Sequence, residues 1–254
     1  MEKTAIIIVT YAKTDFQREL LQKSVEAALK YHPNDTIIVL NDNHEESVED
    51  LLPKAPNLRY ELTKHPRCGE VNAYVWSCEN MHEFKKFAFI HDSVILHNTL
   101  PFIFDSDIHY RPLWFANPYF ASVGLMLQEI EDVIKDVKIG PTDGVALYQI
   151  ILERYIYVVF GCMATWDTNF CEFLKTRTNL LEQAHRFNTR DLRCLFERII
   201  YICFAYAHPQ LAFRVFPTLA ICGDITNHTK PFFNILLDSE LANNPYALKV
   251  WQGR

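Results

Sequence analysis

The chain has 254 residues, with 25 Lys and Arg against 31 Asp and Glu, and a formal net charge of -6. This acidic balance argues against a nucleic-acid partner, because binding along a phosphate backbone relies on clustered Lys and Arg. Its 49% hydrophobic content is that of an ordinary globular protein. The richest apolar run, residues 198–222, is broken by prolines and charged residues, so we predict no transmembrane segment.

The seven cysteines include no pair at zinc-knuckle spacing. We interpret them as reduced thiols, which favours a cytoplasmic location. No internal repeat, low-complexity tract or Gly/Ser linker divides the chain, so we expect one domain over residues 1–254. The oligomeric state is left open.

The first hundred residues alternate strand and helix signals. Apolar, β-branched runs predict strands, and apolar residues at helical spacing predict helices. The expected strands are 5–11, 35–43, 57–63 and 87–96, and the expected helices are 18–32 and 69–81. This order predicts an α/β fold with a mostly parallel, Rossmann-like central sheet flanked by helices.

The remainder of the chain predicts a more helical half. Amphipathic spacing predicts helices at 169–187 and 189–207, the second with Thr189 as its N-cap, and another at 122–140 that is closed by a glycine. Strand-like composition marks 155–162 and 213–225.

Polar residues end or interrupt three of the predicted strands. They are Thr10 and Tyr11, the run 41–43 with Asp42 at its centre, and the run His91, Asp92 and Ser93. Ligands bind parallel sheets at the carboxyl ends of the strands, so these clusters are candidates for one site. The plainer interpretation makes Asp42 a turn carboxylate bonded to local N–H groups and Tyr11 a packed side chain.

These segments resemble the GT-A glycosyltransferases, particularly family 2-like enzymes that move a sugar from a nucleotide-diphosphate donor to an acceptor. The matching pieces are AIIIVTY, TIIVLNDN, CGEVNAYVWSCEN and FAFIHDSVIL, which together span roughly residues 5–100. Three later pieces, FGCMATWDTNFCEFL, CLFERII and ICGDITNH, resemble glycosyltransferase-like proteins of large DNA viruses. The resemblance implies a nucleotide-sugar-binding half at 1–100 and an acceptor-binding half at 101–254.

The resemblance also implies roles for the donor-side residues. It places Asp42 where the family receives the base and ribose, with Thr10 and Tyr11 lining the nucleotide pocket. Arg67, in a loop with Lys64 and Glu70, would reach toward the diphosphate, although a solvated loop explains these residues equally well.

The metal motif is where the sequence departs from the family. In place of two aspartates flanking a variable residue, the chain has His91 and Ser93 flanking Asp92. Mn²⁺ or Mg²⁺ needs only one or two protein carboxylates when phosphate oxygens and water complete its shell, so Asp92 alone can suffice. His91 is suited to an ion such as Mn²⁺ or to a hydrogen bond with phosphate. The resemblance offers His228 as a further ligand, against an ordinary polar turn.

Inverting transfer needs a carboxylate that takes the proton of the acceptor hydroxyl. The resemblance points to Asp191 or Glu197, with Asp143 and Asp167 as outside choices. In the plainer interpretation Asp191 opposes the helix dipole and Glu197 pairs with Arg193.

Two aromatic stretches could contact sugar. Residues 109–120 hold several aromatic side chains that suit either a sugar platform or the core, and Trp166 beside Asp167 suits an acceptor site.

The sequence therefore predicts a nucleotide-sugar-dependent glycosyltransferase that carries out hexosyl or pentosyl transfer, of inverting stereochemistry, onto a glycan or other hydroxyl acceptor, with Mn or Mg as cofactor. A non-catalytic protein that binds a nucleotide sugar or glycan is the alternative, because the flanking aspartates are absent. A sugar nucleotidyltransferase would carry a glycine-rich signature near the N-terminus, and residues 9–16 contain no glycine.

Overall fold

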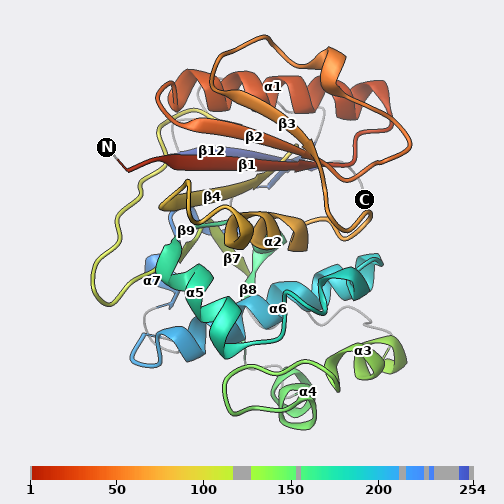
Figure 1. The fold of residues 1–254 in the computed structure, drawn as a ribbon, viewed down its shortest axis with the longest axis vertical. Coiled ribbons are helices and arrows are strands. Elements are labelled where there is room, and N and C mark those ends of the chain that lie inside the picture. The colour runs from red at the N-terminus through yellow and green to blue at the C-terminus, as the bar shows by residue number, and fades with distance from the viewer. Residues whose placement is uncertain are drawn as a thin grey trace.

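The computed structural model describes residues 2–116, 127–152, 156–211, 216–225, 229–231 and 246–251. Its centre is a six-stranded sheet of order β3-β2-β1-β4-β9-β6 (Figure 1). Four of these strands are parallel and are joined by helical or loop crossovers, which confirms the predicted α/β fold. They are β1 (Thr4–Thr10), β2 (Thr36–Asn41), β3 (Leu58–Leu62) and β4 (Lys86–His91).

Helices α1 (Asp15–Tyr31) and α2 (Val71–Glu79) cover the parallel strands. The β1-to-β2 and β3-to-β4 crossovers run in opposite directions across the sheet, and right-handed crossovers then place the two helices on opposite faces. In Figure 1, α1 lies above β1 and β2, and α2 lies below β4. Helix α1 begins three residues before the predicted start because Thr14 and Gln17 form a capping box.

The predicted strand 87–96 is two strands in different sheets. Strand β4 ends at His91, the chain turns at Asp92 and Ser93, and β5 (Val94–Leu96) then pairs with β12 (Ala247–Trp251). The N–H of Val250 donates to the carbonyl of Ser93 at 2.9 Å. Asp92 therefore lies in a turn that β12 contacts through a backbone hydrogen bond to Ser93. Strand β12 was not among the predicted strands.

Two antiparallel strands extend the sheet beyond β4. These are β9 (Ala164–Asp167) and β6 (Tyr110–Pro112). Strand β9 was not among the predicted strands. Tyr110, Trp114 and Trp166 are each fully buried, so these three rings belong to the core.

The second half is rich in helices, as expected. Helix α6 (Arg190–Ala207) begins at the predicted cap, Thr189, whose side chain accepts from the N–H of Leu192. The predicted helix 169–187 is shorter, because the Thr178 hydroxyl bonds the Leu174 carbonyl and Thr178 is extended. The other helices are α3 (Leu127–Ile134), α4 (Gly144–Leu152), α5 (Thr168–Arg177) and α7 (Phe216–Leu219), with short 3₁₀ turns at Glu49–Leu51, Phe160–Cys162 and Ala184–Arg186.

Three predicted boundaries in this half are wrong. The helix expected at 122–140 ends at Ile134, and its start lies partly outside the described residues. The strand expected at 155–162 is only β8 (Val158–Val159), because Gly161 and Cys162 take positive φ angles. Pro217 favours a first helical turn, so 213–225 holds α7 and the short β10 (Gly223–Asp224). The remaining strands are β7 (Trp114–Ala116) and β11 (Thr229–Pro231).

No helix in the described ranges is both long enough and apolar enough to span a bilayer.

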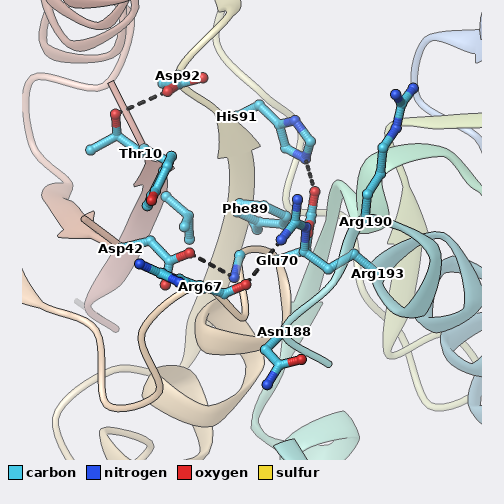
Figure 2. Close-up of a pocket in the computed structure, with 13 residues that line it drawn as sticks. Thr10, Asp42, Arg67, Glu70, Phe89, His91, Asp92, Asn188, Arg190 and Arg193 are labelled. Atoms are coloured by element: carbon cyan, nitrogen blue, oxygen red, sulfur yellow. Dashed lines mark hydrogen bonds and ion pairs between the residues drawn. The ribbon is translucent and has the colours of Figure 1, made fainter. Parts of the chain in front are cut away.

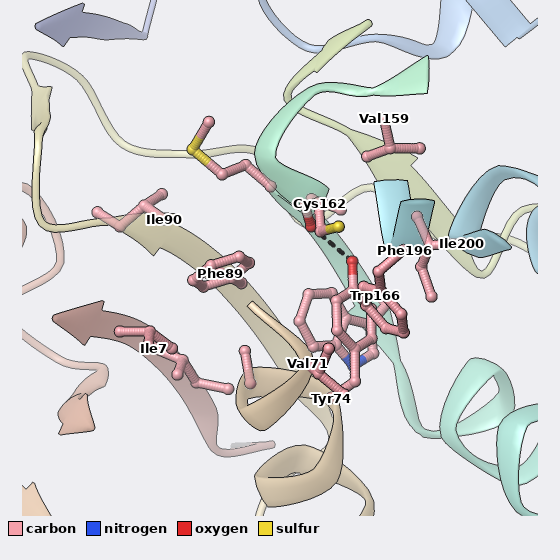
Figure 3. Packing of buried hydrophobic residues seen from close by; sticks show 14 of the residues in the cluster. Ile7, Val71, Tyr74, Phe89, Ile90, Val159, Cys162, Trp166, Phe196 and Ile200 are labelled. Atoms are coloured by element: carbon pink, nitrogen blue, oxygen red, sulfur yellow. Dashed lines mark hydrogen bonds between the residues drawn. The ribbon is translucent and has the colours of Figure 1, made fainter. Parts of the chain in front are cut away.

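An aromatic contact joins the two halves of the chain. The Tyr74 ring of α2 stacks on Trp166 of β9, with ring centroids 4.6 Å apart (Figure 3). The Tyr74 hydroxyl donates to the Cys162 carbonyl at 2.6 Å, and the Trp166 indole N–H donates to the Ser77 hydroxyl at 3.2 Å. Both buried polar groups are thus satisfied, as aromatic side chains of this kind require in a core.

We expect Trp166→Ala to lower the free energy of unfolding by about 3–5 kcal/mol, because it leaves a large cavity between α2 and β9. Urea denaturation followed by far-UV circular dichroism measures this loss. Thr14→Ala, which removes only a helix cap, should cost about 1 kcal/mol. A loss below that of the cap variant would show that Trp166 does not hold the halves together.

Candidate functional site

A pocket opens at the carboxyl ends of the parallel strands. Thr10 of β1 lies beside Asn41 of β2, and Val9 lies beside His91 of β4, so the three strands end together. The cavity measures about 290 Å³. Its lining comes from the ends of β1, β2 and β4, the loop before α2, and the start of α6 (Figure 2). The lining residues are Val9, Thr10, Tyr11, Asp42, Arg67, Gly69, Glu70, Phe89, His91, Asp92, Asn188, Arg190 and Arg193.

The structure brings most of the predicted donor-side residues into this one pocket. Those that line it are Thr10, Tyr11, Asp42, Arg67, His91 and Asp92. Ser93, Asp191 and Glu197 are not among the lining residues, and His228 lies outside the described residues. The individual roles of all ten remain predictions. Asn188, Arg190 and Arg193 were not predicted at the pocket, and they reach it because the start of α6 packs against the first half.

Asp92 lies in the turn that follows β4. Its side chain is buried, and its Oδ2 accepts a hydrogen bond from the Thr10 hydroxyl at 2.9 Å. This bond links the ends of β1 and β4 and orients the carboxylate at the pocket. It provides one hard oxygen ligand of the kind that Mg²⁺ or Mn²⁺ takes alongside phosphate oxygens and water.

Asp42 holds the loop that precedes α2. Its carboxylate accepts hydrogen bonds from the Thr63 hydroxyl, the Gly69 N–H and the Asn72 amide, each at 3.0 Å. Burial raises the pKa of this carboxyl, while the bonds from Gly69 and Thr63 and the nearby Arg193 oppose that rise. Asp42 therefore positions the loop. Its predicted contact with the base or ribose would use the same two carboxylate oxygens that accept these three hydrogen bonds.

Gly69 allows α6 to close over that loop. Its φ angle is +53°, and a Cβ at this position would lie 2.7 Å from Cδ of Arg193. The Arg193 guanidinium also donates to the Arg67 carbonyl at 2.9 Å. These contacts bring a basic side chain of the second half to the rim of the pocket.

His91 is bound by protein groups at both ring nitrogens. Nε2 is 2.9 Å from the Gly161 carbonyl, and Nδ1 is 3.3 Å from the ammonium of Lys249. Because an ammonium only donates and a carbonyl only accepts, the hydrogen-bond pattern assigns the ring proton to Nε2. Both nitrogens are engaged in this way, and the role of His91 toward a metal ion or a phosphate stays a prediction.

Lys249 occupies the neighbourhood of the altered metal motif. Its buried ammonium donates to the Ser93 hydroxyl and approaches His91, the two residues on either side of Asp92 in the sequence. Strand β12 delivers this side chain by pairing with β5. The ammonium of Lys249 thus contacts both residues that flank Asp92 in the sequence.

Glu70 lies in the pocket between two basic groups. Its Oε1 is 3.4 Å from His91 Nε2, and its Oε2 is 3.5 Å from Nε of Arg193. Burial raises the pKa of this carboxyl, and the Arg193 guanidinium opposes the rise. The expected ion pair between Arg193 and Glu197 is not the one the structure has, because α6 presents Arg193 to Glu70.

Glu197 contacts the pocket indirectly, through Gly161. Its Oε1 accepts from the Gly161 N–H at 2.7 Å, while the carbonyl of the same glycine faces His91. Burial, and then the charge of Glu70, raise the pKa of Glu197 to about 8. Asp191 lies in the first turn of α6 and does not line the pocket, as the helix-dipole interpretation expects.

The rim of the pocket is basic. Arg67 and Arg190 are exposed, and Arg193 is half-buried. Guanidinium groups suit the oxygens of a diphosphate because they donate in pairs with a fixed planar geometry. Within the described residues no group of three or more His, Cys, Asp or Glu side chains is arranged to hold a metal ion, so any cation would depend on ligand oxygens in addition to Asp92.

No model of a known protein family matches the chain, and no curated protein matches it. Among solved structures, the Mn/GDP form of core-mannan synthase A from Aspergillus fumigatus has 11% identity and a TM-score of 0.41 over 87% of this chain and 72% of that one. The apo WbbM bifunctional glycosyltransferase has 8% identity and a TM-score of 0.42 over 100% and 46%. S. aureus TarS 1–349 with UDP has 12% identity and a TM-score of 0.29 over 38% and 29%.

The chain therefore spans less than a third of the TarS fragment and less than half of WbbM. With TM-scores below 0.5, these neighbours do not decide what the chain does. The function must come from the pocket itself.

The raised pKa of Glu197 predicts a pH-dependent stability. A carboxyl with a pKa of about 8 in the folded chain and about 4.5 in the unfolded chain keeps its proton to a higher pH in the folded state. The free energy of unfolding should therefore fall as pH rises from 4.5 through 8. Glu197→Gln should flatten this fall in urea titrations, whereas Glu26→Gln, on the exposed face of α1, should leave it unchanged. Equal slopes in all three proteins would contradict the assignment.

We expect Gly161→Ala to displace the His91 ring. The glycine has φ +58°, and an added Cβ would lie 2.8 Å from His91 Nε2. Gly140→Ala is the matched control, because Gly140 has φ +59° but its Cβ would meet Tyr206. Both variants carry similar backbone strain, so only Gly161→Ala should shift the His91 imidazole signals in NMR spectra. Unmoved His91 signals would contradict the contact.

Proposed function

We propose that this pocket binds a nucleotide-diphosphate sugar and that the protein transfers its glycosyl group, a hexose or a pentose, to a hydroxyl of a glycan or other acceptor. One observation carries the proposal. Asp42 after β2 and Asp92 after β4 open into a single cavity at the carboxyl edge of a parallel sheet, facing arginines of the opposite half.

We assign the donor one orientation in the pocket. Tyr11 and Asp42, beyond the ends of β1 and β2, lie on the side we assign to the base and ribose. The diphosphate lies between Asp92 and the arginine rim. Cleavage of the sugar–phosphate bond leaves added negative charge on the β-phosphate, which donors held in advance stabilise most effectively. We assign residues 1–100 to the donor and 101–254 to the acceptor.

A divalent cation, Mn²⁺ or Mg²⁺, fits this arrangement through Asp92. Such ions are commonly held by one or two carboxylates together with substrate phosphates and water. When bound, the ion would add positive charge at the leaving diphosphate. Lys249 and the arginines supply fixed positive charge in the same region, so metal binding should depend on the nucleotide.

A non-catalytic nucleotide-sugar or glycan-binding protein is the second candidate function. It is favoured by the replacement of the family's flanking aspartates with His91 and Ser93, both engaged by Lys249. Binding alone would need the same aspartate and arginines, but it would need no group to accept a proton. The two functions therefore differ in turnover and share the ligand.

Thermal-shift titration with UDP and GDP, with and without Mn²⁺, tests the proposal. We expect at least one nucleotide to raise the melting temperature, and Mn²⁺ to increase the shift. Asp92→Asn should remove the Mn²⁺-dependent part, since an amide is a poor ligand for the ion, and Asp50→Asn on the exposed surface should change nothing. No shift with either nucleotide would contradict the proposal.

Release of UDP or GDP from UDP- and GDP-linked sugars separates the two candidate functions. A transferase should release the nucleoside diphosphate above background in the presence of its acceptor, and more slowly with water as acceptor. Binding without any release would favour the non-catalytic protein.

A further inference from the structure

The pocket contains one carboxylate whose hydrogen bonding is incomplete. Three carboxylates line the cavity, those of Asp42, Glu70 and Asp92. Three donors engage Asp42, and Thr10 engages Asp92. The buried Oε2 of Glu70 has no hydrogen bond and only a 3.5 Å approach from Arg193. A buried oxygen left in this state in a native protein calls for an explanation, such as a catalytic role or a bound water or ion.

Glu70 also lies where donor and acceptor must meet. It caps the start of α2 in the donor half, whereas Arg193 and Gly161 beside it belong to the second half. Figure 2 shows Glu70 below His91, with Arg193 alongside it. A donor whose diphosphate lies between Asp92 and the arginines would carry its sugar past this carboxylate.

The two carboxylates suggested by the family resemblance are less suited to take a proton. Asp191 does not line the pocket. Glu197 is occupied by the Gly161 N–H, and its pKa of about 8 leaves it mostly protonated at neutral pH. Neither side chain lines the pocket.

We infer that Glu70 is the catalytic base of the transfer reaction, an inference that rests on the proposed function. The proton of the acceptor hydroxyl moves to the carboxylate of Glu70 while the hydroxyl oxygen forms a bond to the anomeric carbon. The bond from that carbon to the β-phosphate oxygen breaks, and its electron pair leaves with the nucleoside diphosphate. Glu70 then returns its proton to water.

The surroundings of Glu70 suit this role. Burial and the charge of Asp42 raise the pKa of its carboxyl, whereas Arg193 and Lys249 lower it, and His91 faces Oε1. Glu197 lies close enough for the two carboxyls to influence each other. Burial thus raises the pKa of the Glu70 carboxyl while neighbouring cations oppose the rise, and a more basic carboxylate is a better proton acceptor.

The test uses the full chain and needs no identified acceptor, because water can accept the sugar. Donor hydrolysis is followed as release of UDP or GDP from a panel of UDP- and GDP-linked hexoses and pentoses, across pH 5 to 9. Donor affinity is measured separately by calorimetry. The variants are Glu70→Gln and Glu70→Asp, with Glu79→Gln at the exposed end of the same helix as the control.

We expect Glu70→Gln to keep donor affinity within about threefold and to lose at least a hundredfold in rate, the usual contribution of a general base. The acidic limb of its pH–rate profile should disappear. Glu70→Asp should retain that limb at a reduced rate, and this variant carries the test if Glu70→Gln does not fold. Glu79→Gln should match the wild-type chain.

Two results would overturn the inference while leaving the proposed function standing. One is a wild-type chain that turns over donor and a Glu70→Gln variant that does so within fivefold. The other is a parallel loss of affinity and rate with an unchanged pH profile, which would make Glu70 a donor-binding residue. Donor binding without turnover by the wild-type chain would instead remove the proposed transfer, and Glu70 as its base along with it.

Discussion

The parallel pairing of β1 with β2 on one side and β4 on the other is the constraint on which the site depends. Its register ends all three strands at one edge, where Thr10, Asp42 and Asp92 emerge together. Parallel strands that are buried on both faces cannot slip by one residue without turning their apolar side chains around. The same packing that stabilises the sheet therefore fixes the spacing of the two aspartates at the pocket.

Several ionisable groups share the low-dielectric space behind the pocket. Asp42, Glu70 and Glu197 all have raised pKa values, with burial as the first cause, and Arg193 and Lys249 provide the opposing charge. Burying a carboxylate without hydrogen bonds or a countercharge is costly. Asp42 and Glu197 satisfy this demand with N–H donors of loops, and those bonds in turn hold Gly69 and Gly161 in their left-handed conformations.

Residues of the second half complete the pocket by contacting first-half residues that are far away in the sequence. Arg193 closes over Gly69, the Gly161 peptide joins His91 to Glu197, and Lys249 binds the turn after β4. The two glycines have no room for a side chain at these contacts. The donor side can therefore be built from local strand ends, but its electrostatics depend on α6 and β12, which belong to the second half of the chain.

The sequence by itself determined the α/β order of the first hundred residues and singled out the polar runs around Asp42 and Asp92, because apolar periodicity and abrupt changes to polar residues are local signals. It also located the cap of α6 at Thr189. Only the tertiary structure decided that β4 breaks at Asp92, that Glu70 faces Arg193, and that Lys249 binds His91 and Ser93. These contacts join residues far apart in the chain. Local sequence propensities depend on neighbouring residues only, so they do not predict which distant side chain will bond a buried polar group.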